Sequence, residues 1–259
     1  MFLNPKWPVP RRTDSSNGTD GGPKRQEPWY DFRKEGESLW HGRFSKEELK
    51  SWASRMTSHA AAGQLQQRPT AREGGLFKRH WFANPVKSLP RDYLTLVRAW
   101  DLASASEQSG DPDYTVGVLM GYDRDFKIFY VMDVIRGRFT PGEREEKIVS
   151  TARLDGTSCM IRIPQDPGSA GRFEAHHLAG LLRGYRISTE REAGSKQNRA
   201  DPFAAQCEHG YVKLVEAVWN VAFVEELCAF PNAAHDDQVD AAAAAFRGLS
   251  RAGPGLVVG

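Results

Sequence analysis

The sequence lacks the marks of membrane-spanning, secreted and zinc-binding proteins. No apolar run approaches the about 20 residues that a membrane span needs, and the N-terminal stretch MFLNPKWPVP has no signal-peptide core. The three cysteines, Cys159, Cys207 and Cys228, are odd in number and show no C-x-x-C spacing. They indicate free thiols in a reducing compartment, without a disulfide framework or a zinc knuckle. We therefore expect a cytosolic protein.

A nucleotide-binding motif is missing as well. The pattern G-x-x-x-x-G-K-[ST], whose glycine-rich backbone surrounds the phosphates of ATP, does not occur, and no glycine is followed by lysine. The sequence also shows no internal repeat. A complete ATP-driven motor of the P-loop class is therefore not expected within this chain.

The small net charge of +2 conceals an uneven distribution. Residues 1–92 hold 17 Lys and Arg against 10 Asp and Glu, whereas residues 93–259 hold 18 against 23. A basic leading part followed by an acidic part suggests a polyanionic partner for the one and cation binding for the other. Chance variation between two solvated surfaces explains the same numbers, so charge alone leaves both interpretations open.

Composition divides the chain into four parts. Residues 1–44, with clustered Pro, Gly, Ser, Asn and Asp near the start, predict a flexible N-terminal linker or tail. Residues 45–90 predict a helical connecting segment, which begins with an S-x-x-E capping-box pattern. Residues 91–250 form the predicted main domain, and residues 251–259 a C-terminal tail.

Hydrophobic periodicity in the main domain predicts a sheet flanked by helices. The alternating stretch LTLVRAWDLA is followed by two β-rich runs around a GYDRD turn, so the first three strands are expected to form an antiparallel meander. Helical and strand patterns then alternate. The predicted fold class is α/β, a mixed sheet with an antiparallel meander followed by parallel strands. The first expected strand lies at 94–103, the next two form a hairpin at 114–137, and the last two lie at 158–166 and 185–191. The expected helices lie at 143–154, 170–184, 198–209 and 219–227, and a last one begins near residue 235.

Two of the expected strands end in an aspartate. Asp101 closes the first strand after six largely apolar residues, and Asp166 follows the fourth strand in IPQDPGSAG. Ligands of open α/β sheets gather beyond the carboxyl ends of strands, so both positions are candidates for chemistry. Asp166, before Pro-Gly-Ser, is equally well explained as a turn or helix cap. Asp101 is harder to explain in this way, because a buried strand acid is costly unless it is paired or bound to metal.

A third group of acids begins the last helix, in the stretch HDDQVDAAAAA. Asp240 lies three residues after Asp237 and four after Asp236, so it shares a helical face with either. Favourable interaction with the helix dipole is the simpler interpretation. Like charges at this spacing repel each other, however, and the alanine run predicts close packing against another element. Clustered carboxylates with few histidines suit Mg²⁺ or Mn²⁺ better than zinc.

Several stretches of the sequence, taken in their order along the chain, resemble the C-terminal nuclease half of the large terminase subunit of tailed bacteriophages, which has a ribonuclease H-like fold. The resemblance covers roughly residues 70–250 and depends on REGGLFKRHWF, RAWDLA followed by GDPDYTVGV, IPQDPGSAG, GSKQNRADPFAAQCEHG and HDDQVDAAAAA. It implies a ribonuclease H-like mixed sheet flanked by helices. Because the phosphate-binding loop is missing, the chain is expected to be an excised domain or a separately encoded nuclease part.

The resemblance also implies which residues carry the chemistry. Catalysis is assigned to Asp101, Asp166 and Asp237, which hold two Mg²⁺ or Mn²⁺ ions. Asp237 is favoured within the acidic cluster at the helix start. The full set of implied metal ligands is Asp101, Asp166, Asp237, Asp240, Asp236 and Asp113, the last as a further acid toward a second metal.

Basic residues near these acids are candidates for contacts to DNA. Lys196 and Arg199, in GSKQNRA, are expected nearest the scissile phosphate, and Arg172 and Arg191 line the path beside the acids. Such contacts to the backbone are independent of base sequence and sensitive to salt. A solvated surface explains each of these residues equally well. His235 either positions water or a phosphate or caps the last helix.

The predicted function is a metal-dependent endonuclease that cleaves double-stranded concatemeric viral DNA during phage genome packaging, by two-metal-ion hydrolysis. The family implies the terminase ATPase domain, the small terminase subunit and the portal as partners, and the cytoplasm of the infected bacterial host as location. Two alternatives remain open. One is another ribonuclease H-like nuclease of the resolvase or transposase type, and the other is a non-catalytic DNA-gripping or docking module of a packaging motor.

Overall fold

The computed structural model describes residues 38, 40, 42–65, 75–103, 113–165, 168–191 and 194–252. The chain divides into two compact units, residues 1–53 with 58–71 and residues 54–57 with 72–259. Asp166 lies outside the described residues, as does most of the expected tails at 1–44 and 251–259.

The smaller unit contains two short helices, α1 (Lys46–Ala53) and α2 (Ser58–Gln64). A reciprocal capping box begins α1, since the Ser45 N–H donates to Glu48 Oε2 over 2.8 Å and the Glu48 N–H donates to Ser45 Oγ over 3.1 Å. The capping-box pattern of the sequence therefore marks a true helix start.

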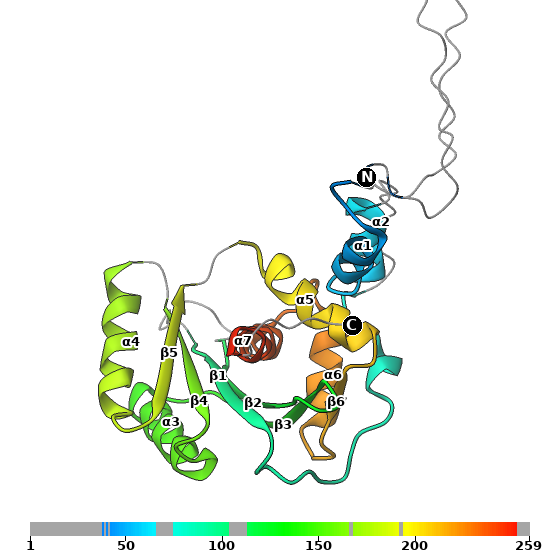
Figure 1. The fold of residues 1–259 in the computed structure, drawn as a ribbon. Coiled ribbons are helices and arrows are strands. Elements are labelled where there is room, and N and C mark those ends of the chain that lie inside the picture. Colours follow the sequence, from blue (N-terminus) through cyan, green and yellow to red (C-terminus); the bar gives the residue numbers. More distant parts are fainter. Residues whose placement is uncertain are drawn as a thin grey trace, which may run out of the picture. The chain divides into compact units, whose positions relative to one another are not determined.

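The larger unit is built on a six-stranded sheet in the order β5-β4-β1-β2-β3-β6 (Figure 1). Strands β1, β2 and β3 are antiparallel neighbours, whereas β4 pairs with β1, β5 with β4 and β6 with β3 in parallel. The expected meander followed by parallel strands is confirmed. The bounds are β1 (Thr95–Asp101), β2 (Thr115–Asp123), β3 (Ile128–Gly137), β4 (Met160–Gln165), β5 (Arg186–Arg191) and β6 (Val212–Leu214).

Strand β6 was not expected, because its three residues are too few to show a periodic pattern. The helices of this unit are the short 3₁₀ helix η1 (Arg79–Phe82), α3 (Pro141–Asp155), α4 (Ser169–Leu181), α5 (Lys196–Glu208), α6 (Asn220–Ala229) and α7 (Asp237–Ala252). Within the described parts of the chain, no helix has the length and apolar character needed to cross a membrane.

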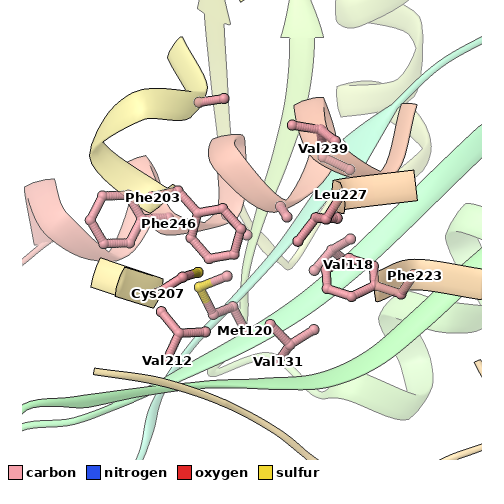
Figure 2. Close-up of a cluster of buried hydrophobic side chains, with 14 of the residues drawn as sticks. Val118, Met120, Val131, Phe203, Cys207, Val212, Phe223, Leu227, Val239 and Phe246 are labelled. Carbon is pink, nitrogen blue, oxygen red and sulfur yellow. The ribbon is translucent and has the colours of Figure 1, made fainter. Parts of the chain in front are cut away.

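Helices α5, α6 and α7 contribute to the core on one face of the sheet, with α7 over the central strands β1 and β2 (Figure 1). Figure 2 shows the apolar layer between them, in which Val118, Met120 and Val131 of the strands lie opposite Phe203 of α5 and Phe246 of α7. Burial of this contiguous apolar surface is the main force that holds α7 against the sheet.

The alanine run of α7 lets the helix approach the sheet closely, as expected from the sequence. Ala241, Ala242 and Ala245 are fully buried. One turn further on, a Cβ added to Gly248 would lie 2.5 Å from Arg162 Cδ, so a larger residue does not fit there. The start of α7 is thereby fixed relative to the strand ends beside it.

Helices α3 and α4 cover the opposite face. Trp100 of β1 packs there with Ile148 of α3, Ile161 of β4 and Leu178 of α4. A Cβ added to Gly117 on β2 would lie 2.6 Å from Trp100 Cζ3, so only glycine leaves room for the indole. Because successive strand residues point to opposite faces, the neighbours of Trp100 in the chain point toward α7.

Candidate functional site

Asp101 is the last residue of β1, and alternation places it on the α7 face with Val97 and Ala99. It pairs in register with Val116 of β2 and is partly buried. The parallel neighbour β4 ends at Gln165, the residue before Asp166, at the same edge of the sheet. The structure thus confirms Asp101 as a strand-end acid, whereas the side chain of Asp166 is not described.

The first turn of α7 brings Asp237 to this edge of the sheet. The Tyr114 backbone N–H donates to Asp237 Oδ2 over 3.3 Å, and Tyr114 immediately precedes β2. Since Asp101 pairs with Val116, two residues further along β2, the structure brings Asp101 and Asp237 to the same end and the same face.

The environment of Asp237 disfavours its negative charge. Burial raises the pKa of the Asp237 carboxyl above its ordinary value, and the charges of Glu226, Asp113 and Asp236 raise it further, against the effect of the Tyr114 hydrogen bond. The His235 ring lies nearby, with Nδ1 3.9 Å from Asp237 Oδ2. Three acids thus lie close enough to Asp237 to disfavour its negative charge.

Asp236 and Asp240 have different partners, on helix α5. The Lys196 ammonium group lies 2.5 Å from Asp236 Oδ1 and 3.4 Å from Asp240 Oδ2, and Arg199 Nη2 lies 2.9 Å from Asp240 Oδ1. Partial burial lowers the pKa of Lys196, but the hydrogen bond to Asp236 and the charges of both acids outweigh this and raise it well above its ordinary value. Two of the three clustered acids are thus bound to cationic side chains.

Glu226 of α6 holds the beginning of α7 in place. Its Oε1 accepts the backbone N–H of Gln238 over 2.7 Å, and its Oε2 accepts the Gln238 side-chain amide over 2.6 Å. A carboxylate from another helix therefore satisfies one of the open N–H groups in the first turn of α7. Glu226 makes this contact to Gln238, and capping by His235 stays a prediction.

The segment that follows Asp101 is fixed through both backbone groups of Ala103. The Ala103 N–H donates to Thr115 Oγ1 over 3.3 Å, and its C=O accepts from Arg144 Nη1 over 3.0 Å. Arg144, on α3, also pairs with Glu174 of α4. One arginine thus joins the chain after β1 to the helix that follows β4.

Sequence reasoning missed an aromatic–arginine cluster next to Asp237. The guanidinium carbon of Arg136 lies 3.5 Å from the centroid of the Tyr114 ring, and that of Arg138 lies 4.3 Å from it. The edge of the His235 ring contacts the same tyrosine at a centroid distance of 5.1 Å. Alternation in VIRGR could have placed both arginines on one face, but no local signal predicts their contact with Tyr114.

The expected DNA-contacting residues differ in how accessible they are. Arg172 on α4 and Arg191 at the end of β5 are exposed, and the Lys196 side chain is 51 % exposed. The Arg199 side chain is only 11 % exposed because it lies against Asp240. Asp113 is exposed and close enough to Asp237 to influence its charge.

Among the described residues, no group of three or more His, Cys, Asp or Glu side chains is arranged closely enough to hold a metal ion. Burial raises the pKa of all three thiols, that of Cys159 to about 12. Their thiolate forms are therefore scarce near neutral pH, and the cysteines are poor candidates for nucleophiles.

Comparison with known proteins agrees with this architecture. A family model described as the terminase RNaseH-like domain matches residues 98–247. No curated protein matches the chain. Among solved structures, the P22 large terminase nuclease domain has a TM-score of 0.50 at 14 % sequence identity, with 69 % of this chain and 94 % of that chain covered.

Two further solved structures are similar at the same identity of 14 %. The human cytomegalovirus terminase nuclease domain, soaked with Mn and with an inhibitor bound, has a TM-score of 0.48 and covers 66 % of this chain and 94 % of its own. The large terminase nuclease of the thermophilic phage G20c with bound magnesium also has a TM-score of 0.48, with 68 % and 98 % covered. Because the family model spans more than half of the sequence, the chain belongs to the family of terminase RNaseH-like domains.

Proposed function

We propose that this chain is a metal-dependent endonuclease that cleaves double-stranded, concatemeric viral DNA during phage genome packaging. The observation that carries the proposal is the placement of two acids: β1 ends in Asp101 and α7 begins with Asp237, at one end and on one face of the sheet. Membership in a family of terminase RNaseH-like domains supports a nuclease role for acids in this position.

The chemistry around Asp237 fits a hard divalent cation. Its charged neighbours Glu226, Asp113 and Asp236 destabilise the carboxylate, and a bound cation would remove that repulsion. Carboxylate oxygens without thiolate ligands suit Mg²⁺ or Mn²⁺. We assign Asp101, Asp166 and Asp237 as the principal ligands and Asp113 as an additional acid.

The pairing of Asp236 and Asp240 with α5 supports the choice of Asp237 within the acidic cluster. Lys196 and Arg199 already balance the charge of these two acids, so a metal ion would have to displace a cationic side chain to bind there. The ionic neighbour of Asp237 is instead the His235 ring, with Nδ1 3.9 Å from Asp237 Oδ2. Asp236 and Asp240 are therefore proposed to hold α5 against α7 and to act on the metal site only indirectly.

When bound, two such ions would activate a water molecule and stabilise the leaving 3′-oxygen of the phosphodiester. The protein's own residues orient the ligands: the Tyr114 N–H fixes Asp237 Oδ2, and the bonds of Ala103 to Thr115 and Arg144 fix the segment after Asp101. Lys196 is half exposed at the edge of the site, and to contact a phosphate it would exchange its ion pairs with Asp236 and Asp240.

The partners follow from the same proposal. The chain would act in the cytoplasm of the infected bacterial host, together with the terminase ATPase domain, the small terminase subunit and the portal. Because the sequence contains no P-loop, the energy for DNA movement would come from a separate ATPase domain.

The proposal is tested by incubating supercoiled plasmid with the protein in EDTA, Mg²⁺ or Mn²⁺. We expect nicking and linearisation only with metal, and loss of both in Asp101→Asn and Asp237→Asn. Asp125→Asn, in the exposed turn between β2 and β3, is the matched control and should cleave like wild type. The thermal shift on adding Mn²⁺ gives a second readout, which the two site variants should lose.

Two outcomes would contradict the proposal. Cleavage that persists in both site variants would place the active site elsewhere. A folded wild-type protein that cleaves in no metal, yet binds DNA tightly in EDTA, would instead favour the DNA-gripping module of a packaging motor.

A further inference from the structure

A cationic surface cluster lies beside the carboxylate site, formed by Tyr114, Arg136 and Arg138. The two guanidinium carbons are 3.5 Å and 4.3 Å from the centroid of the tyrosine ring. Both arginines are exposed, whereas Tyr114 is partly buried. The cluster therefore places two guanidinium groups on a single aromatic support, and Arg136 also pairs with Glu226.

The register of the sheet places this cluster on the same face as the acids. Val134 lies in the core under α7, and alternation along β3 places Arg136 on the same face. Arg138 follows the last residue of β3 and contacts the same Tyr114 ring. Across the ladder, Gly137 is paired with Thr115, the neighbour of Tyr114. Since the Tyr114 N–H donates to Asp237, the cluster and the carboxylate are joined through one residue.

The two guanidinium groups are chemically suited to an anionic ligand. The face of the tyrosine ring attracts both groups, and Glu226 Oε2 lies 3.5 Å from Arg136 Nη2. A guanidinium group has five N–H donors in a planar arrangement that matches the oxygens of phosphate. Stacking on Tyr114 restricts both side chains and so lowers the entropy lost when they bind.

A nuclease of this kind also needs such a feature. A polyanion that approaches Asp101, Asp113 and Asp237 is repelled by them, and cations at the margin of the site would offset the repulsion. Lys196 and Arg199 lie on the α5 side and are engaged by Asp236 and Asp240. The side formed by the end of β3 has Arg136 and Arg138 instead.

We propose that Arg136 and Arg138, stacked on Tyr114, form a binding subsite for backbone phosphates of duplex DNA next to the scissile phosphate. The inference rests on the proposed nuclease function and adds a binding surface to it. The ligand is the sugar–phosphate backbone, so the subsite contributes affinity without base preference. The acids would then lie between two groups of cationic side chains, Arg136 and Arg138 on one side and Lys196 and Arg199 of α5 on the other.

The test measures binding of a fluorescent duplex by the full chain in Ca²⁺, over a range of salt concentrations. Each lost phosphate contact should make the slope of log K against log salt shallower by about 1. The slope should become shallower by about 1 in Arg138→Ala and by about 2 in Arg136→Ala/Arg138→Ala. At about 0.1 M salt, the loss of each arginine should reduce the affinity for the duplex roughly five- to tenfold. Arg138→Ala is the more direct variant, because it leaves the ion pair of Arg136 with Glu226 intact.

The matched control removes two exposed arginines elsewhere, Arg153 on α3 and Arg183 after α4. Arg153→Ala/Arg183→Ala carries the same change in net charge, so a general loss of electrostatic attraction would affect both double variants equally. Tyr114→Leu removes the aromatic support but keeps both charges and the backbone N–H. It should weaken binding less than the loss of both arginines.

The outcomes separate this inference from the proposed function. If the wild type cleaves DNA but the Arg136 and Arg138 variants match the control in affinity, KM and salt slope, the subsite is refuted and the nuclease assignment stands. If the wild type binds but cleaves in no metal, while the arginine variants lose binding selectively, the subsite stands and the nuclease assignment falls. A wild type that binds no duplex in Ca²⁺ would refute the subsite.

Discussion

The two sides of the first turn of α7 carry the same type of residue in opposite electrostatic environments. Asp240 is 5 % exposed and receives Arg199 and Lys196 as partners. Asp237 is 7 % exposed, accepts one backbone N–H, and has the carboxylates of Glu226 and Asp113 among its charged neighbours. Burial is nearly equal, so burial alone does not distinguish Asp237, the proposed metal ligand, from Asp240, the proposed structural acid. The charge balance around each acid does.

A third buried acid shows what a purely structural carboxylate looks like in this protein. Asp155, at the end of α3 on the opposite face of the sheet, receives Arg98 Nε over 2.7 Å and Nη2 over 3.1 Å. Burial lowers the pKa of Arg98, but Asp155 and Asp133 outweigh that effect and raise it. Asp240 resembles Asp155 in having a close arginine partner, whereas Asp237 resembles neither.

This difference follows a general trade-off between stability and function. A site that must attract a cation gains by keeping uncompensated negative charge, and the folded state loses stability for the same reason. A helix that must stay docked gains from compensated charges. The start of α7 combines both environments within five residues, because the helical period turns Asp236 and Asp240 toward α5 and Asp237 toward β2.

The largest expected effect is the loss of DNA cleavage in the variant Asp237→Asn. If Asp237 is a direct metal ligand, the rate should fall by more than the 10- to 100-fold that the loss of an outer-shell partner costs. The rate loss in Asp240→Asn should stay within 10- to 100-fold, because Asp240 would influence the site only through Arg199 and Lys196. Single-turnover cleavage of plasmid at saturating Mn²⁺ makes the comparison, and equal losses in the two variants would remove the distinction between the acids.

The next largest expected effect is a loss of folding stability, in the variant Asp240→Asn. Asp240→Asn leaves the largely buried Arg199 without its charged partner, which should lower the free energy of unfolding by about 1–3 kcal/mol. Urea unfolding in EDTA measures this. Asp236→Asn is the control, because Asp236 is more exposed and its partner Lys196 can turn to solvent. A smaller loss in Asp240→Asn than in Asp236→Asn would argue against a structural role for Asp240.

In the absence of metal, Asp237→Asn should stabilise the protein. The raised pKa means that the folded state binds this proton more readily than the unfolded chain, so the ionised carboxylate lowers stability at every pH above the folded-state pKa. Removing the charge should therefore raise the melting temperature above that of wild type. The difference from wild type should vanish as the pH falls through the raised pKa.

Differential scanning calorimetry in EDTA at several pH values tests this expectation. Adding Mn²⁺ should then reverse the order, because metal binding stabilises the wild-type fold and not the variant. A variant that is less stable than wild type at neutral pH without metal would show that Asp237 is a structural acid like Asp155.

Periodicity was enough to predict the sheet and the strand-end position of Asp101. The alternation in LTLVRAWDLA defines which residues of β1 face α7, and the alanine run predicts its close approach. What the sequence could not provide was the partner of each acid. Asp236, Asp237 and Asp240 are indistinguishable in HDDQVD, and only the packing of α5 and β2 around the helix start separates them.

Residues that contribute through long-range contacts were missed for the same reason. Glu226 caps α7 from 12 positions earlier in the chain, and Arg144 reaches Ala103 across 41 positions. Neither belongs to a local motif. Arg136 and Arg138 were overlooked because arginines near the end of a strand usually belong to a solvated surface, and the residue on which both stack, Tyr114, lies just before another strand, β2.

The smallest expected effect belongs to Lys196, and it tests how far charge compensation on the α5 side reaches. Its side chain is half exposed, so its ion pairs with Asp236 and Asp240 should contribute only about 0.2–1 kcal/mol. Lys196→Ala should therefore lower stability slightly at low salt and hardly at all at high salt, where exposed pairs are screened. Urea unfolding at two salt concentrations measures this, with Lys213→Ala on the exposed edge of β6 as the control. A loss as large as that of Asp240→Asn would mean that Lys196, and not Arg199, supplies most of the charge that holds α5 against α7.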